Sequence, residues 1–241
     1  LHAAHEALKI ERKRRSPLEL DLPERKILLK PDGTVDRVVI PPRLDTHRLI
    51  EEFMVLANVA AAETLEAERQ PLIYRTHDEP SIEKMNALAE FLASIDIEIA
   101  KGQVLKPQQF NGILERVRDT ENEHLVNEVV LRSQAQAEYT PDNYGHFGLH
   151  LQRYAHFTSP IRRYADLIVH RALIRALGLG KDGLPDGAMS ELAEIAARIS
   201  AAERRAMAAE RETIDRLIAG HLADHIGATF EGRIAGVTKS G

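Results

Sequence analysis

Apolar residues recur at helical spacing through most of this chain, and this periodicity constrains its fold more than any other feature. After Pro41 and Pro42, Asp45 or Thr46 can cap a long helix that runs to about residue 68. Its predicted buried stripe consists of Leu49, Ile50, Phe53, Leu56 and Ala57. Similar patterns predict helices near residues 81–95, from Pro107 through Phe110, Ile113, Leu114 and Val117, over 122–137 and over 189–225. We therefore expect a predominantly helical fold.

Two short β-branched runs are the main exception to the helical pattern. In "KILLKPDGTVDRVVIPP" they flank Pro31-Asp32-Gly33, which is a turn sequence, so residues 26–40 are expected to form a hairpin. A shorter extended segment is expected at "PLIYRTHDEPS". The expected fold class is therefore α+β, predominantly helical, with a short hairpin.

Both ends of the sequence suggest a part of a longer protein. The chain starts at Leu1, and "LHAAHEALKIERKRR" lacks the apolar run of a secretory signal, so it is interpreted as a helix entered midway whose start was removed. At the other end "IGATFEGRIAGVTKSG" alternates as a strand does, and residues 228–238 are expected to be extended. We interpret this segment as the beginning of an unfinished second domain.

Composition and charge exclude several classes of function. Hydrophobic residues make up 44% and charged residues 29%, which is typical of a globular rather than a disordered chain. No apolar run is long enough to cross a bilayer, so no membrane partner is expected. The absence of cysteine excludes disulfides and thiolate metal sites and fits a cytoplasmic location. A formal net charge of −5 means that any nucleic-acid binding must depend on a local positive patch.

The stretch "YAHFTSPIRRYADLIVHRAL" combines the start of a helix with two adjacent positive charges. Ser159 is a favoured N-cap and Pro160 suits the first helical position. The apolar face would consist of Ile161, Tyr164, Ala165, Ile168 and Ala172. A helix N-terminus already favours an anion, and Arg162 and Arg163 add positive charge there. Because guanidinium groups grip phosphate with two parallel hydrogen bonds, a phosphate group is the expected partner.

A surface ion pair is the alternative interpretation of these arginines. Asp166 lies four residues after Arg162 and three after Arg163, and either spacing brings opposite charges together on a helix. Spacing alone favours this structural role over phosphate binding.

A longer motif favours phosphate binding over the structural ion pair. "HFGLHLQRYAHFTSPIRRYADLIVHRAL" resembles the signature of the ribonuclease II and ribonuclease R family of processive 3′-to-5′ exoribonucleases. "RLIEEFMVLAN", "YRTHDEPS" and "GHFGL" match the accompanying blocks in the same order, and the sequence is more similar to ribonuclease R than to ribonuclease II. The resemblance implies that residues 1–226 are the distal part of an RNB-type catalytic domain. Residues 227–241 would then be the first strand of a truncated OB-fold RNA-binding domain.

The resemblance also implies residue roles. In the family, magnesium ions held by an aspartate cluster position water against the last phosphodiester, and an arginine stabilises the charge that develops on the phosphate. By position, this catalytic arginine is Arg162, and Arg163 suits a contact with the RNA backbone. The remaining RNA-binding candidates are Ser159, Glu51, His156 and Glu210. Leu20 stands where the family has a phenylalanine that stacks on the terminal bases, which predicts a weaker aromatic clamp.

Two of these candidates, Glu51 and His156, have plainer interpretations. Glu51 would otherwise be part of a solvated helix face, and His156 is equally consistent with a buried, hydrogen-bonded histidine. The position of Glu210 is glutamate in ribonuclease II relatives but not throughout ribonuclease R. The "RKRR" run at residues 12–15 is most simply a solvated face.

The family's aspartate cluster lies upstream of the matched region, and the aspartates of this chain are scattered. The resemblance therefore implies that the parent protein is a monomeric, magnesium-dependent exoribonuclease that acts on the 3′ end of single-stranded RNA. Its Mg²⁺ would be bound by residues absent from this chain, which would be inactive alone. The alternative is a non-catalytic RNA-binding or scaffold protein that kept the fold and lost its carboxylates.

Two histidine pairs have the spacing of helical zinc sites, but neither predicts a metal site. His221 and His225 lack the glutamate and the third ligand of such motifs. Between His146 and His150, Gly148 lies in a turn-rich segment, which argues against one helical face. No metal ligands are therefore predicted in this chain.

Overall fold

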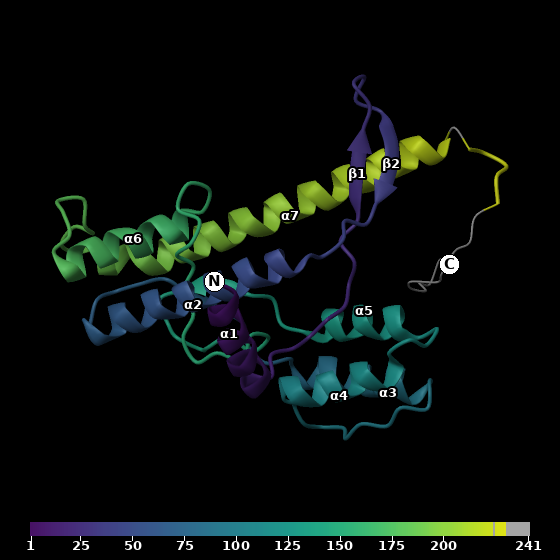
Figure 1. The fold of residues 1–241 in the computed structure, drawn as a ribbon, viewed down its shortest axis with the longest axis horizontal. Helices are drawn as coiled ribbons and strands as arrows, with labels where there is room; N and C mark the ends of the chain where they lie inside the picture. Colours follow the sequence, from purple (N-terminus) through teal and green to yellow (C-terminus); the bar gives the residue numbers. More distant parts are fainter. Residues whose placement is uncertain (224, 230–241) are drawn as a thin grey trace. The chain divides into compact units, whose positions relative to one another are not determined.

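The computed structural model describes residues 1–223 and 225–229, and it confirms the predominantly helical α+β fold (Figure 1). The chain divides into two compact units. The first contains residues 1–20 and 43–203, and the second contains residues 21–42 and the chain from Arg204 onward. All candidate residues except Glu210 belong to the first unit.

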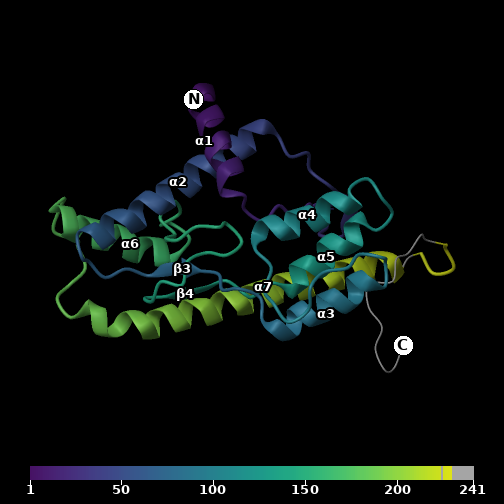
Figure 2. The same cartoon turned by 90° about the horizontal axis from the view of Figure 1, so that it is seen from below.

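The first unit contains most of the helices. They are α1 (His2–Arg15), α2 (Asp45–Ala67), α3 (Ile82–Ala93), α4 (Pro107–Val117), α5 (Glu123–Ser133), α6 (Tyr164–Leu177) and the short 3-10 helix η1 (Ala188–Glu191). The long helix α7 (Leu192–Ala223) begins in this unit and ends in the second. Strands β3 (Tyr74–Thr76) and β4 (Glu138–Thr140) pair antiparallel, with Arg75 opposite Tyr139 (Figure 2).

The predicted hairpin is confirmed in the second unit. Strands β1 (Lys26–Leu29) and β2 (Val35–Val39) pair antiparallel, with Lys26 opposite Val39. In the turn, Gly33 has a φ of 83°, and the Thr34 N–H donates to Asp32 Oδ1 at 2.9 Å. Asp32 and Gly33 therefore supply the side-chain acceptor and the positive φ that this turn requires.

Two clusters of buried apolar residues form the core of the first unit. One includes residues of α2, β3, β4, α6 and α7, among them Leu65, Tyr74 and Val169. The other is built from α3, α4 and α5, which lie together in both views (Figures 1 and 2). The predicted stripe of α4 is confirmed, since all four of its members are buried: Phe110, Ile113, Leu114 and Val117.

The predicted buried face of α2 is wrong at Ile50 and Leu56, whereas Phe53 and Ala57 are half-buried. Leu49 is buried, but Ile50 and Leu56 are 55% and 49% exposed. The buried residues of this helix are Leu49, Glu52, Val55, Asn58, Ala61, Ala62 and Leu65. Two of them are polar side chains with specific partners, so the face cannot be found from hydrophobicity alone. The N-cap prediction is also wrong, because the N-cap is Leu44 and both Asp45 and Thr46 are helical.

Helix α6 begins later than its sequence predicts. Ser159 is not its N-cap; that position belongs to Arg163, which has extended backbone angles of −122° and 121°. The N–H groups of Arg162 and Arg163 both donate to the Ser159 carbonyl, at 3.2 and 3.1 Å, and close a turn that does not continue as a helix. Of the predicted apolar face, Ala165, Ile168 and Ala172 are buried, whereas Ile161 and Tyr164 are exposed.

Other predicted boundaries differ less. Helix α5 ends at Ser133 rather than near residue 137. Most of the predicted terminal strand lies outside the described residues, since residues 230–241 are not described. Within the described part of the chain, none of the helices has the length and hydrophobicity needed to span a bilayer.

Candidate functional site

The carboxylate of Asp166 organises the turn that leads into α6. Its side chain is fully buried and accepts three hydrogen bonds. The Ser159 N–H donates to Oδ1 at 2.7 Å, and Arg163 donates from Nε to Oδ2 at 2.8 Å and from Nη2 to Oδ1 at 2.7 Å. An ion pair with Asp166 is therefore present and is made by Arg163 rather than by Arg162, but it is buried and so differs from the predicted pair on a helix surface.

Arg162 has a different environment from its neighbour. It is exposed, and its side chain makes no hydrogen bond or ion pair with any residue in the described part of the chain. An external anion would meet a guanidinium whose donors are all free. Arg163, by contrast, has a side chain that is 18% exposed and already uses two nitrogens on Asp166. This arrangement suits Arg162 to bind a phosphate and Arg163 to support it.

His156 lies among aromatic side chains close to this turn. The Tyr139 hydroxyl and His156 Nδ1 share a hydrogen bond of 2.9 Å, and the Tyr139 and Tyr154 rings meet the imidazole edge-on. Burial, followed by the positive charge of Arg163, lowers the pKa of His156 to about 3. The imidazole is therefore neutral near pH 7. Its contacts fit the interpretation of His156 as a hydrogen-bonded histidine of the protein interior.

A buried asparagine that the sequence did not reveal fixes the chain before the turn. Asn58 of α2 donates from Nδ2 to the Tyr154 hydroxyl at 2.9 Å and accepts from the Phe157 N–H at 2.9 Å. His170 of α6 stacks on the Phe157 ring and shares a 2.9 Å hydrogen bond with the Phe157 carbonyl. Residues 154–157 are thus held by two helices. A polar residue in the buried stripe of a helix was the only signal that could have identified Asn58.

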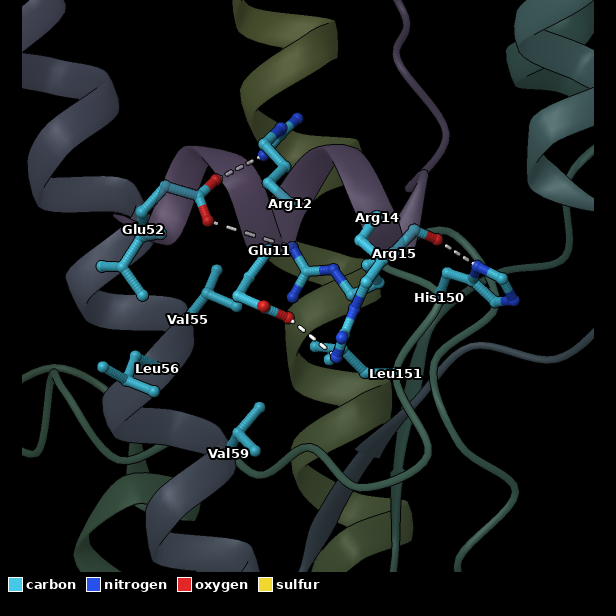
Figure 3. A pocket seen from close by; sticks show the side chains of 11 residues that line it. Glu11, Arg12, Arg14, Arg15, Glu52, Val55, Leu56, Val59, His150 and Leu151 are labelled. Carbon is cyan, nitrogen blue, oxygen red and sulfur yellow. Dashed lines mark hydrogen bonds and ion pairs between the residues drawn. The ribbon is translucent and has the colours of Figure 1, made fainter. Parts of the chain in front are cut away.

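Glu51 lies in a second charged area, on α2. Its side chain is 40% exposed and pairs with Arg43, and one of its oxygens lies 3.9 Å from Arg12 Nη1. The neighbouring Glu52 is buried. It accepts from Arg12 at 2.6 Å and lies 4.0 Å from Arg15, as the dashed lines in Figure 3 show. Arg43 and Arg12 thus partly neutralise the charge of Glu51.

A cavity of about 510 Å³ lies beside Glu52, between α1, α2 and residues 150–151 (Figure 3). One side is apolar, with Val55 and Leu151 among its residues, and the other carries the arginines of α1. The prediction of a solvated face for residues 12–15 is correct for Lys13 and Arg14, which are exposed, but wrong for Arg12 and Arg15. Those two turn toward Glu52, which the sequence run alone does not show.

The remaining candidates belong to other segments than the turn of residues 159–163. Glu210 is exposed on the part of α7 that belongs to the second unit. Leu20 is partly buried and packs against the cluster of α3, α4 and α5. At the end of α7, the His225 ring bonds to the His221 carbonyl at 2.9 Å. No group of three or more histidine, aspartate or glutamate side chains is placed to hold a metal ion in residues 1–223 and 225–229.

Comparison with known proteins agrees with the predicted resemblance. The family model of the RNB domain matches residues 1–178. The chain belongs to the RNB domain family. A relative named ribonuclease R from Escherichia coli is 37% identical over all of this chain. The chain spans 31% of the length of that relative.

Solved structures of the same family confirm the fold of this RNB domain segment. The apo form of Mycoplasma genitalium RNase R has a TM-score of 0.90 and 28% identity, and the match covers 97% of this chain and 37% of that one. The same protein in complex with ribose-methylated single-stranded RNA has a TM-score of 0.89, with the same identity and coverage. The chain therefore spans about a third of the length of these relatives.

Proposed function

We propose that this chain is the part of a 3′-to-5′ exoribonuclease that presents Arg162 to the scissile phosphate of single-stranded RNA. The observation that carries the proposal is the contrast between the two arginines. Arg163 is bound by Asp166, whereas Arg162 is exposed and has no partner among the described residues. The relatives support it, because they are named ribonuclease R and one of them is seen with RNA.

The chemistry assigned to Arg162 is electrostatic. When a phosphodiester is hydrolysed, negative charge grows on the non-bridging oxygens, and a planar guanidinium can donate two parallel hydrogen bonds to them. Arg162 can donate these hydrogen bonds without first breaking an ion pair with any described residue. A free arginine beside a bonded neighbour is thus available to stabilise the charge that develops in the transition state.

The metal of the family is proposed to come from elsewhere in the protein. Magnesium prefers clustered carboxylates, and the described residues contain no cluster that fits it. Magnesium would supply the activated water in the complete enzyme, which is proposed to be a cytoplasmic monomer. For this chain we propose an RNB segment over residues 1–226 and the start of an OB-fold domain over 227–241.

The other candidate residues are proposed to line the RNA path. They are Ser159, Arg163, His156, Glu51 and Glu210. For Arg163 and Ser159 the contact would be limited, because the Arg163 fork and the Ser159 N–H already bind Asp166. A neutral His156 would contribute a hydrogen bond rather than a charge.

The test compares Arg162→Lys with Arg163→Lys in the full-length protein. Single-turnover cleavage of a short RNA is measured with magnesium, and binding is measured without metal. Arg162→Lys should lower the rate by about 100- to 1000-fold with little change in affinity, because lysine keeps the charge but loses the planar donor array. Arg163→Lys should have a much smaller effect. Equal and mild effects would contradict the proposal, and a wild-type protein that binds RNA without cleaving it would support the non-catalytic alternative.

A further inference from the structure

Asp166 is a buried carboxylate whose bonds span the turn that carries Arg162. It accepts from Ser159 at the start of the turn and from Arg163 at its end, through three hydrogen bonds of 2.7–2.8 Å. We infer that Asp166 is a positioning residue. Together with Arg163 it holds residues 159–163 in the conformation that directs Arg162 away from the protein. The inference rests on the function proposed for Arg162.

Burial makes this carboxylate sensitive to its partners. A buried charge is tolerated only when it is paired and hydrogen-bonded, and Asp166 meets both conditions within a single turn. Its helix is firmly supported, because Ala165, Ile168 and Val169 are buried in the core. The turn is closed a second time by the Ser159 carbonyl, which accepts from the N–H groups of Arg162 and Arg163. Arg162 therefore lies between two fixed points on a rigid support.

The pair has a second consequence for the charge of Arg162. Asp166 is also close to Arg162 in the chain, and a carboxylate that paired with Arg162 would neutralise its charge. Arg163 occupies both oxygens of Asp166 and therefore keeps that carboxylate from neutralising Arg162. The order of the two arginines is thus functional. The first remains free because the second satisfies the buried acid.

The first experiment measures Asp166→Asn and Arg163→Lys in the full-length protein. Asparagine keeps the size of the side chain but loses the charge, and its amide N–H₂ cannot accept from Arg163. Asp166→Asn should lower single-turnover cleavage by about 10- to 100-fold, since a misplacement of roughly 1 Å has effects of that size. RNA affinity without metal should stay within about twofold. Arg163→Lys keeps a positive charge beside Asp166 but loses the contact through two nitrogens, so it should lower the rate, by less than Asp166→Asn does.

The second experiment separates positioning from general stability. Asp166→Asn is combined with Arg162→Lys, and the rate of the double variant is compared with that of Arg162→Lys alone. If Asp166 acts through Arg162, the rate of the double variant should lie within about threefold of that of the single variant. Multiplied effects, or full activity of Asp166→Asn, would overturn the inference. A mild effect of Arg162→Lys itself would instead contradict the proposed function.

Two further variants serve as a substitute for Asp166→Asn and as a control. If Asp166→Asn does not fold, Arg163→Gln is measured alone and with Arg162→Lys, and the same non-additive result is expected. Arg118→Gln is the matched control, because Arg118 pairs with Glu115 at the same three-residue spacing but on the surface. It should leave both cleavage and binding unchanged.

Discussion

The amide nitrogen of Asn58 donates to the Tyr154 hydroxyl at 2.9 Å, although 96 residues separate them in the chain. The carbonyl oxygen of the same side chain accepts from the Phe157 N–H, and Asn58 is only 2% exposed. One side chain of α2 therefore fixes the segment that leads to the turn of Arg162. This links the stability of the helical core to the geometry of the candidate site.

Asn58→Ala should destabilise the chain. It leaves a buried hydroxyl and a buried backbone N–H without their partner, and each such group costs about 1 to 3 kcal/mol. A loss of roughly 2 to 4 kcal/mol in the free energy of unfolding is expected from urea denaturation. Gln108→Ala, at an exposed position of α4, is the control and should change stability by less than about 0.5 kcal/mol. Equal stability of the two variants would show that water replaces the asparagine.

Stability should fall as the pH is lowered from about 6.5 to 5. The folded pKa of His156 is lowered to about 3, so the native imidazole stays neutral while the unfolded one takes up a proton below its ordinary pKa. The pKa of His146 is also lowered to about 3 by burial, and it adds to the slope. Each contributes at most about 1.4 kcal/mol per pH unit in this window.

His156→Gln should flatten this pH dependence, because glutamine keeps a hydrogen-bonding group opposite Tyr139 but does not titrate. The measurement is the free energy of unfolding at several pH values between 5 and 7. Carboxylates change little there, so a difference in slope reports the histidine. Parallel curves for the two proteins would show that His156 has the same pKa in the folded and unfolded states.

Gly148→Ala should be destabilising, by about 1 to 3 kcal/mol. A Cβ at this position would lie 2.9 Å from His77 Nδ1 and 3.1 Å from His77 Cε1. The buried His77 ring has little freedom to move, because its Nδ1 accepts from the Gly148 N–H and its Nε2 bonds to the Ala135 carbonyl. Gly180→Ala is the control, since its Cβ would meet only Ile174, at 3.7 Å. Equal melting temperatures of the two variants would contradict this account.

The isolated chain should not degrade RNA in the presence of magnesium. It lacks a described cluster of carboxylates that would hold the metal, although it carries the proposed catalytic arginine. The assay follows a labelled single strand with the purified chain and with the full-length protein. Steady release of 5′-mononucleotides by the chain alone would show that the metal site lies within these residues.

Sequence patterns predicted the elements that depend on apolar periodicity. The stripe of α4 is entirely apolar, and every predicted member is buried. The stripe of α2 was misplaced because Glu52 and Asn58 occupy buried positions that hydrophobicity does not reveal. Their burial depends on partners that lie far away in the sequence, such as Arg12 and Tyr154.

The candidate site shows the same limit at shorter range. Ser159 and Pro160 have the properties of a helix start, but the Ser159 N–H is bound by the Asp166 carboxylate and α6 begins at Tyr164. Spacing allowed Asp166 to bind either arginine. Only the backbone conformation at residues 159–163 decides between them, and it selects Arg163. The motif predicted the candidate residues but could not assign their contacts.

The attachment of α1 determines how easily this helix detaches from the rest of the chain. Only one residue of this helix, His5, is buried, whereas Arg12 and Arg15 reach across to Glu52 of α2. Apolar burial thus contributes little to the attachment, and ion pairs contribute much of it. Because the burial of Glu52 shields these pairs from dissolved ions, loss of its charge in Glu52→Gln, rather than added salt, should loosen α1 while the two apolar clusters stay intact. The first fifteen residues would then exchange their amide protons and become accessible to trypsin while the remainder stays folded.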